Sequence, residues 1–429
     1  MSELKNIEFQ YGKKIIKVCI PESSIISFPH INNVQKPVDE LKEFMNALEN
    51  PIKSPTLPCI ASIKENAVVV IPDRTRPLPT HTLLPIILNE LNAGGIGDKQ
   101  IKAMIALGTH RGMTANEIRQ MVGKKVLQRI TVMNHDWDNP DILVPLGRTK
   151  NGTWIDVNKI VYEADLVVGL SSVKPHRAAG WSGGAKIIDP GVCGKRTIDG
   201  THYLTVDYSI NEITGVLDNP IRQEIEDVAR KVGLDFSINL VLNEKEEILH
   251  VSAGDFIHAH KNAVEFAEKI YRDPQSEKAD FMVCGSGDWG PDFWSAVQAI
   301  FPAEYLVKDG GTVVIFADCP EGFSPEHPQI LEFGYRSIPE IKNLVNEGKL
   351  VDRVAAGHMA AVARIVLQKN VECVILSEGI SKEVAESVGF VWMEKPQSAI
   401  DYVFNKHGHS SRGYLFPVKS ITETVVIPW

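Results

Sequence analysis

The sequence lacks the signals of several protein classes. Its apolar runs all stop short of the roughly 18 residues that a membrane-spanning helix needs. The first residues, MSELKNIEFQYGKK, have no apolar core of the kind found in signal peptides. We therefore expect a cytoplasmic protein with no membrane partner.

Cysteine is sparse and scattered. No two of the six cysteines form a CxxC pair or a zinc-finger spacing: Cys19, Cys59, Cys193, Cys284, Cys319 and Cys373. This distribution is typical of a reducing compartment with mostly buried free thiols.

Basic side chains are fewer than acidic ones. The formal net charge is −9 at pH 7, which argues against a nucleic acid or an anionic membrane as the main partner. A small anionic substrate remains compatible with this balance, because a local cluster of arginine and lysine decides whether such a molecule binds.

The length of the chain favours two domains. A chain of 429 residues exceeds what one hydrophobic core usually supports, and 44% apolar with 23% charged residues is ordinary for a globular protein. The polar stretch 273–280 (DPQSEKAD) is the best linker candidate. We predict an N-terminal domain of residues 1–274, completed by 411–429 as an edge strand, and a smaller domain of residues 275–410.

The pattern along the chain predicts an α/β fold. Residues 1–20 alternate apolar and polar side chains, as a hairpin does. Short apolar strands at 67–73, 101–109, 129–135 and 164–173 then alternate with segments of helical periodicity, and the alternation resumes after residue 280. We therefore expect two α/β domains with mainly parallel sheets.

Polar side chains follow several of these strands at the point where each strand ends. They include Asp73-Arg74-Thr75-Arg76, Thr109-His110-Arg111, His135-Asp136 and Lys174-Pro175-His176. Because ligands of open α/β sheets bind beyond the carboxyl ends of the strands, these side chains mark a candidate site. We expect the active site here, in the cleft between the two domains.

Residues 171–202 hold the densest set of reactive side chains: His176, Lys186 and His202, with a glycine-rich turn at 180–184. Glycines let backbone N–H groups approach a ligand closely, and a lysine there can contact a phosphate or act as an amine nucleophile. The Walker A pattern does not fit, since Ala185 and Ile187 replace its glycine and hydroxyl residue.

The residue types suggest a chemistry. Arginine recognises carboxylates and phosphates, and histidine acts as general acid or base near neutral pH. Two histidines on opposite sides of one carbon are suited to inverting a stereocentre. A third histidine is suited to binding a transition metal, whose other ligands would have to come from a cofactor.

An alternative comes from residues 285–290. Gly285, Gly287 and Gly290 match GxGxxG after a predicted strand, which would indicate an NAD-dependent 2-hydroxy acid oxidoreductase with His110 or His176 as acid–base residue. Pro291 follows at once, and the next strand ends in Asp318, beyond the usual spacing of about 20 residues. A catalytically silent homologue that binds a nucleotide or anion is a third possibility.

Taken together, the motifs resemble the nickel-dependent lactate racemase family. DRTRP (73–77), GTHRGMT (108–114), NHDWDNP (134–140), KPHRAAGWSGGAK (174–186) and the later His202 carry the resemblance, which covers essentially the whole chain. It implies a nickel-pincer nucleotide, a pyridinium mononucleotide whose two sulfur arms bind nickel. Lys186 would be its covalent attachment point and His202 the metal ligand.

The same resemblance implies the remaining roles. His110 and His176 would be catalytic, Arg76 would bind substrate, and the cofactor site would include Asp73, Arg74, Thr75, Lys174, Gly183 and Gly184. The implied reaction is racemisation or epimerisation at C2 of a 2-hydroxy acid, by proton-coupled hydride transfer through a 2-keto acid. Partners would be the small-molecule substrate and, transiently, the proteins that make the cofactor.

Two departures from the family bear on the substrate. Ser295 and Gln298 stand where lactate racemases carry a glutamine and a lysine, and His358 lies in a region where they place a tryptophan. The loss of a cation predicts a substrate larger or more polar than lactate, such as a sugar acid, contacted by these three residues. Lactate racemase activity proper remains an alternative.

Overall fold

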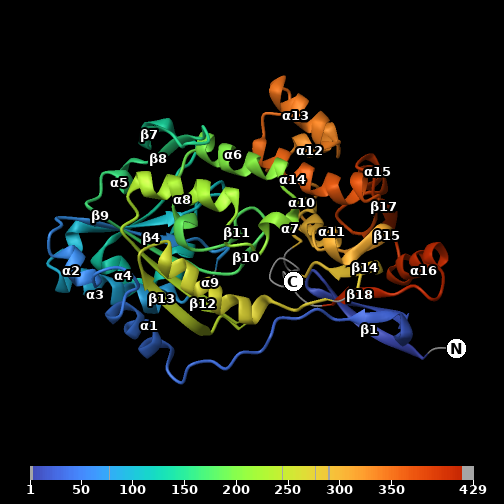
Figure 1. The fold of residues 1–429 in the computed structure, drawn as a ribbon, viewed down its shortest axis with the longest axis horizontal. Coiled ribbons are helices and arrows are strands. Elements are labelled where there is room, and N and C mark those ends of the chain that lie inside the picture. Colours follow the sequence, from blue (N-terminus) through green and yellow to red (C-terminus); the bar gives the residue numbers. More distant parts are fainter. Residues whose placement is uncertain (1–2, 77, 244, 276, 288–289, 418–429) are drawn as a thin grey trace. The chain divides into compact units, whose positions relative to one another are not determined.

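The computed structural model describes residues 3–76, 78–243, 245–275, 277–287 and 290–417 (Figure 1). The chain forms two compact units. The central unit is made of Asn33–His202 and Val216–Ile270, and the terminal unit of Met1–Asn32, Tyr203–Gly215 and Tyr271–Trp429.

The central unit is built on a six-stranded sheet of order β13-β12-β9-β4-β5-β6. Its strands are β4 (Ala67–Pro72), β5 (Ile101–Ala106), β6 (Thr131–Asn134), β9 (Leu166–Ser172), β12 (Phe236–Leu242) and β13 (Ile248–Gly254). All neighbours are parallel except β12 and β13, which are antiparallel. Every residue of β4 is buried, as expected for a strand covered on both faces.

Helices α1 (Glu40–Glu49), α2 (Leu57–Ala61), α3 (Thr80–Ala93) and α4 (Ala115–Arg129) pack against one face of this sheet. The same core cluster takes Ala67, Val69 and Ile71 from β4, the alternate residues that share one face of a strand. Thr114 begins α4 with a capping box, since its hydroxyl accepts from Glu117 N and Glu117 accepts from Thr114 N.

The remaining elements of the central unit are shorter or lie toward the other face. They are η2 (Asp98–Gln100), η3 (Pro140–Ile142), β7 (Leu143–Arg148), β8 (Trp154–Asn158), α5 (Lys159–Tyr162), β10 (Pro175–His176), β11 (Gly180–Trp181), η4 (Gly184–Ile187), α6 (Lys195–Tyr203, whose last residue begins the terminal unit), α8 (Pro220–Val232) and α9 (His258–Tyr271, likewise).

The terminal unit has a parallel six-stranded sheet of order β17-β16-β15-β14-β18-β3. Its strands are β3 (Ile25–Ser27), β14 (Ala279–Gly285), β15 (Val307–Phe316), β16 (Glu372–Leu376), β17 (Val391–Met393) and β18 (Gly413–Phe416). The predicted hairpin is present as β1 (Leu4–Tyr11) and β2 (Lys14–Pro21), which are antiparallel.

The helices of the terminal unit are mostly short. They are η1 (Glu22–Ser24), η5 (Leu204–Asp207), α7 (Ile210–Ile213), α10 (Phe293–Val297), η6 (Gln298–Ile300), α11 (Ala303–Leu306), α12 (Gln329–Phe333), α13 (Ile338–Asn346), α14 (Arg353–Ala363), the π-helical turn η7 (Arg364–Gln368), α15 (Lys382–Ser387) and α16 (Pro396–His407).

The predicted α/β fold with mainly parallel sheets is confirmed. The units differ from the predicted domain ranges at the chain ends, because residues 3–32 pack with the later sheet. Phe9 and Ile20 of the hairpin share a core cluster with Phe281 and Phe316. Likewise β18 pairs with β14 and β3 rather than with the earlier sheet, and residues 418–429 of the predicted edge strand lie outside the described residues.

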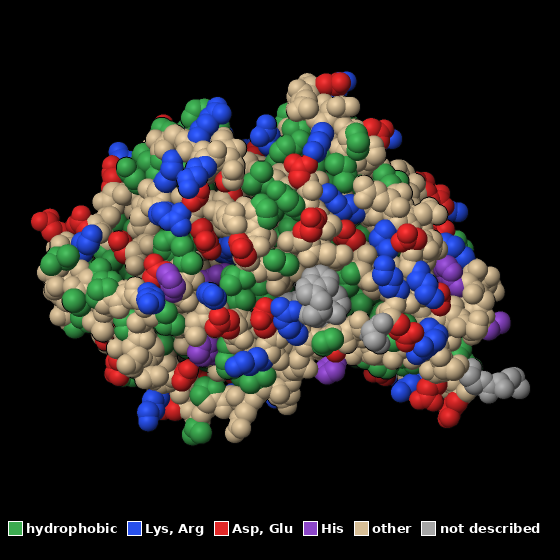
Figure 2. Space-filling model, in the orientation of Figure 1, with side chains coloured by type: hydrophobic (Ala, Val, Ile, Leu, Met, Phe, Trp, Pro, Cys, Tyr) green, Lys and Arg blue, Asp and Glu red, His purple; other side chains and the backbone are tan. Residues whose placement is uncertain are grey.

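The surface carries charges of both signs. On the face shown in Figure 2, acidic and basic side chains are interspersed over both units. Within the described part of the chain, none of the helices has the length and apolar character needed to cross a bilayer.

Candidate functional site

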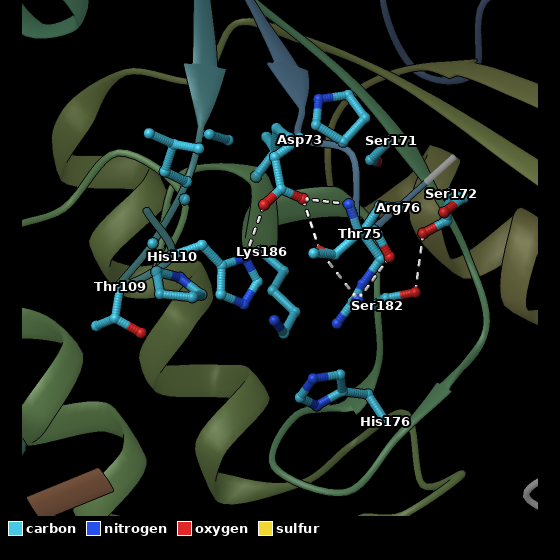
Figure 3. A pocket seen from close by; sticks show the side chains of 18 of the residues that line it. Asp73, Thr75, Arg76, Thr109, His110, Ser171, Ser172, His176, Ser182 and Lys186 are labelled. Carbon is cyan, nitrogen blue, oxygen red and sulfur yellow. Dashed lines mark hydrogen bonds and ion pairs between the residues drawn. The ribbon is translucent and has the colours of Figure 1, made fainter. Parts of the chain in front are cut away.

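A pocket lies in the central unit at the carboxyl ends of β4, β5 and β9 (Figure 3). Eight of the residues predicted from sequence line it: Asp73, Thr75, Arg76, His110, His176, Gly183, Lys186 and His202. Thr109 of the strand-end motif lines it too, as do three hydroxyl side chains that the sequence analysis did not single out: Ser171, Ser172 and Ser182. The convergence of strand ends has therefore brought the distant motifs to one place.

His110 is paired with a carboxylate. Its Nδ1 lies 2.7 Å from Asp73 Oδ2, and the other carboxylate oxygen accepts from the N (3.0 Å) and the Oγ1 (2.6 Å) of Thr75. Burial by itself raises the pKa of Asp73, but the hydrogen bond and charge of His110, together with Thr75 and Arg76, hold that pKa below its ordinary value. Because the carboxylate is ionised, Nδ1 donates to it, and in the neutral ring the lone pair is on Nε2.

In the neutral His176 ring the proton is on the other nitrogen. Its Nδ1 accepts a hydrogen bond from the backbone N of Ala178 at 3.1 Å, so the neutral ring carries its proton on Nε2. Burial lowers the pKa of His176 well below its ordinary value, and the nearby cations Lys186, Arg76 and Arg177 lower it further. The neutral form is favoured near neutral pH.

The glycine-rich turn places Lys186 over the sheet. Gly183 and Gly184 have φ values of 82° and 56°, which favour glycine. Below the turn, a Cβ at Gly169 of β9 would lie 2.7 Å from Ile187 Cγ2, so the missing side chain lets the turn pack directly on the strand. In Figure 3 the Lys186 side chain extends into the space that the rings of His110 and His176 face.

Three residues far along the chain hold this turn. Arg222, which is 2% exposed, donates to the carbonyl oxygens of Trp181 and of Gly183 (3.2 Å). Asn239 Oδ1 accepts from Gly184 N at 2.8 Å, and His260 Nε2 donates to Ser182 O at 2.8 Å. Sequence reasoning missed all three residues.

The sequence contains a signal that could have identified Arg222. Arg222 precedes Ile225 by three residues and Ala229 by seven, so all three lie on the buried face of α8. A cation on the apolar face of an amphipathic helix needs a buried partner, and here the partners are carbonyl oxygens of the turn.

Replacing Arg222 with methionine should destabilise the protein. The change removes two charge-assisted hydrogen bonds and leaves buried carbonyl oxygens without their donor, so we expect a loss of about 3 kcal/mol in the free energy of unfolding. Urea unfolding measures it. The matched control is Arg230→Met on the same helix, whose side chain is 54% exposed and should cost at most about 1 kcal/mol. Equal stabilities of the two variants would contradict this role for Arg222.

The pocket concentrates positive charge. Burial, aided by Arg76 and Arg222, lowers the pKa of Lys186 to about 7, and burial lowers the pKa of Arg177 to about 10. Such a pocket favours an anionic ligand, which would compensate the crowded cations. It also keeps a large share of the Lys186 amine neutral, and therefore nucleophilic, at neutral pH.

His202 lines the same pocket from α6. Its Nδ1 donates to the backbone oxygen of Ile198 at 2.9 Å, which places the lone pair of the neutral ring on Nε2. Metal-binding histidines typically have this arrangement, because the donated hydrogen bond fixes the tautomer and the orientation of the ring.

Three predicted cofactor residues have other placements. Arg74 is half-exposed, with its Nε 3.9 Å from Glu117. The backbone of Lys174 holds Ser182, since Lys174 N donates to Ser182 Oγ (2.9 Å) and Lys174 O accepts from Ser182 N (2.8 Å). Gly184 contributes to the packing of the turn, because a Cβ there would lie 2.8 Å from the ring of His260.

The predicted substrate residues Ser295, Gln298 and His358 belong to the terminal unit. Ser295 on α10 and Gln298 at the start of η6 are partly exposed. His358 has no exposed surface, and its ring stacks on Trp294 with ring centroids 4.0 Å apart. A ring buried in this way is a core residue, so a substrate contact at His358 is not supported by its position.

The GxGxxG match has a packing explanation at its first glycine. A Cβ at Gly285 would lie 2.6 Å from the backbone oxygen of Gln10, so the hairpin approaches the loop too closely for any side chain. Residues 288 and 289 of the motif lie outside the described residues.

His135 has a structural role, as it is 2% exposed and its Nε2 donates to Cys193 O at 2.9 Å.

Among the described residues, no group of three or more His, Cys, Asp and Glu side chains is arranged to hold a metal ion.

Comparison with known proteins finds relatives of the chain in one family. A family model described as the lactate racemase N-terminal domain matches residues 11–215. The lactate racemase of Thermoanaerobacterium thermosaccharolyticum is 31% identical over 328 residues, covering 75% of this chain and 76% of the relative. The lactate racemase of Lactiplantibacillus plantarum is 29% identical over 325 residues, with the same coverage.

Two solved structures resemble the fold of this chain. The lactate racemase apoprotein from T. thermosaccharolyticum superposes with a TM-score of 0.85 and 25% identity, covering 98% of this chain and 99% of that one. A Thermotoga maritima protein with a TM-score of 0.68 and 20% identity, covering 90% of this chain and all of that one, shares the fold. The chain belongs to the lactate racemase family and is an isomerase.

Proposed function

We propose that the protein is a racemase or epimerase that inverts C2 of a 2-hydroxy acid. The observation that carries the proposal is the pair of imidazoles, His110 and His176, lining one cationic pocket with the amine of Lys186. Both relatives named above are lactate racemases, which supports inversion at such a carbon.

The hydrogen bonds of the two rings support acid–base work on two faces of a substrate. Asp73 holds His110 with an accepting Nε2, suited to take the proton of a hydroxyl group. Ala178 holds His176 with its proton on Nε2, suited to hydrogen-bond to a carbonyl or hydroxyl oxygen. When the substrate is the other enantiomer, the two rings exchange roles, because the reverse reaction passes through the same steps.

Arg76 supports recognition of the carboxylate. It lines the pocket beside His176 and lowers the pKa of that ring through its charge. A guanidinium matches a carboxylate in a bidentate way and holds the 2-carbon in a fixed place relative to the two imidazoles. A bound anion would also relieve the repulsion among the cations of the pocket.

The residues fit the cofactor expected of this family. The lone pair on His202 Nε2 is suited to complete the coordination of nickel. The amine of Lys186, with its pKa lowered to about 7, is suited to form a covalent amide-type link. The serine hydroxyls at positions 171, 172 and 182 line the same pocket and could hydrogen-bond to a phosphate.

When bound, a nickel-pincer nucleotide would supply the acceptor for the hydride that leaves C2. Residues of the chain would do the rest: His110 or His176, whichever ring is neutral, removes the hydroxyl proton, Arg76 orients the carboxylate, and the 2-keto acid so formed stays in the pocket until a protonated imidazole returns a proton to its oxygen. The proteins that make the cofactor would be transient partners.

The substrate proposed is larger or more polar than lactate, such as a sugar acid. Ser295 and Gln298 support it as neutral polar side chains that are partly exposed in the terminal unit. His358, being buried, does not contribute to this proposal.

The test is racemisation by protein co-expressed with cofactor-biosynthesis enzymes. Single enantiomers of lactate, longer 2-hydroxy acids and aldonic acids would be followed by chiral chromatography, with NAD added in parallel. We expect redox-neutral inversion that is fastest with a longer or hydroxylated acid. Fastest turnover of lactate would overturn the substrate class, and stoichiometric NADH formation would favour the oxidoreductase instead.

A further inference from the structure

Helix α6 carries His202 to the pocket, and a single residue of β8, Asp156, binds the first turn of this helix in several ways. The carboxylate of Asp156 accepts two hydrogen bonds from Arg196, from Nε and from Nη2, each at 2.7 Å. Asp156 N donates to Thr197 Oγ1 at 2.7 Å, and Asp156 O accepts from Gly194 N at 2.8 Å and from Thr197 Oγ1 at 3.2 Å. The side chain, the N–H group and the carbonyl group of one residue therefore all bind the same segment.

Asp156 and Arg196 form a two-point ion pair. The Asp156 side chain is 9% exposed, whereas the Arg196 side chain is 55% exposed. Two N–H···O bonds from one guanidinium to one carboxylate fix the orientation of both groups. A buried carboxylate is costly without its cation, so the pair ties the first turn of α6 to β8.

Two glycines let the helix lie close against the β7–β8 hairpin. A Cβ at Gly194 would lie 2.5 Å from Leu143 Cδ1 of β7, and a Cβ at Gly200 would lie 2.6 Å from Thr153 Cγ2. Both distances are below van der Waals contact, so α6 could not lie where it does with a side chain at either position. The helix is therefore docked on the hairpin both at its start and at Gly200.

The strand end after β6 holds the segment that leads into α6. His135 donates from Nε2 to Cys193 O at 2.9 Å, and its Nδ1 accepts from Asn158 Nδ2 at 3.1 Å. Trp137 O accepts from Lys195 N at 3.3 Å. This strand end therefore supports α6 rather than lining the pocket.

We propose that Asp156 is a positioning residue for His202: by holding the first turn of α6 on β8, it fixes where the imidazole lies in the pocket wall. His202 is five residues beyond Thr197, about 7 Å along an α-helix, and the helix transmits the position of its first turn over that distance. His202 Nδ1 is held in turn by Ile198 O at 2.9 Å, within the same helix. The proposal deepens the proposed function and rests on it for the role of His202 as a nickel ligand.

A metal ligand tolerates little displacement. Replacing the residues that orient a ligand typically lowers metal affinity about 10- to 100-fold. Lys186, the proposed attachment point, lies on η4 and not on α6. A loosened α6 should therefore weaken the bond between His202 and nickel and leave the covalent link at Lys186 in place.

The first test uses protein loaded by co-expression with the cofactor-biosynthesis enzymes. Nickel release into EDTA is followed by elemental analysis, and the Lys186 adduct by intact-protein mass. We expect Asp156→Asn to keep the adduct at the wild-type level and to release nickel about tenfold faster, because the change removes the charge that binds Arg196. Nickel release at the wild-type rate would overturn the proposal.

The matched control is Asp199→Asn. Asp199 is also an acid paired with a cation of α6, but its partner, Lys195 at 2.9 Å, belongs to the same helix. We expect this variant to release nickel at the wild-type rate. Equal acceleration by the two variants would show that any acid lost on or beside α6 has the effect, and would overturn the specific role of Asp156.

A double-mutant cycle separates positioning from general destabilisation. If Asp156 acts through His202, Asp156→Asn adds nothing to the nickel release of His202→Ala, which is already fast. Acceleration by the same factor in both backgrounds would overturn the proposal and leave the proposed function standing. Wild-type nickel retention by His202→Ala would contradict the proposed metal ligand itself, and this proposal with it, so the two failures can be told apart.

The second test needs neither cofactor nor turnover. Amide hydrogen exchange of cofactor-free protein, read from peptides that cover residues 198–203, reports how firmly α6 is held. We expect exchange about tenfold faster in Asp156→Asn and at most about twofold faster in Asp199→Asn.

Arg196→Lys breaks the same pair from its half-exposed side and should fold normally. Lysine keeps the charge but not the two-point geometry, so we expect a smaller acceleration of exchange than in Asp156→Asn. Unchanged exchange in both variants of the pair would overturn the proposal.

Discussion

Replacement of Lys186 by arginine is expected to abolish both the covalent attachment of the cofactor and racemisation. Arginine keeps the positive charge, but its guanidinium stays protonated and is not a nucleophile. The amine of Lys186, whose pKa is lowered to about 7, is the group suited to form the link. We expect the rate to fall more than about 1,000-fold, which corresponds to about 4 kcal/mol of transition-state stabilisation.

Intact-protein mass and metal content give the direct readout. Wild-type protein loaded by co-expression should carry an adduct and about one nickel per chain, and Lys186→Arg should carry neither. The control is Lys195→Arg, on an exposed lysine of α6 that pairs with Asp199 at 2.9 Å, which should keep adduct and rate. An adduct of normal mass on Lys186→Arg would show that another residue is the attachment point.

Substitution of Asp73 by asparagine is expected to have the second largest effect. The carboxylate accepts from His110 Nδ1 at 2.7 Å and so leaves the lone pair on Nε2. The Asn amide can instead donate to Nδ1, which moves the ring proton to Nε2 and removes the base. A loss of about 1,000-fold in kcat with a smaller change in KM is expected, as for carboxylates that set the tautomer of a catalytic histidine.

A graded control is available beside it. Thr75→Val removes the hydroxyl that donates to Asp73 Oδ1 at 2.6 Å but leaves the backbone N–H donor at 3.0 Å, so about a tenfold loss is expected. Nitrogen-15 chemical shifts of His110 would report the tautomer in each variant. If Asp73→Asn kept kcat within tenfold of the wild type, or kept the wild-type tautomer, the role of this pair would be wrong.

The sequence analysis located most of the site because its signals are local. Asp73, His110 and His176 each follow a recognisable apolar strand, and Lys186 follows a glycine-rich turn, so strand periodicity alone places them at one edge of a sheet. The capping box of Thr114 was predictable for the same reason, since its partners are three residues apart.

Other features could not be read in this way. The hairpin β1–β2 was predicted, but its packing against Phe281 and Phe316 depends on partners hundreds of residues away. The antiparallel pairing of β13 with β12 in an otherwise parallel sheet likewise depends on contacts across the sheet. The burial of His358, whose ring lies in the core of the terminal unit, also depends on tertiary packing.

The α/β alternation, the strand-end residues and the motifs of the family can all be read from the sequence. These depend on spacings within one strand, turn or helix, where the physics is local. The folded structure was needed to show which distant residues hold the turn of Lys186 and which nitrogen of His110 and of His176 carries the proton. Burial and hydrogen-bond partners come from segments that meet only when the chain has folded, so no local pattern encodes them.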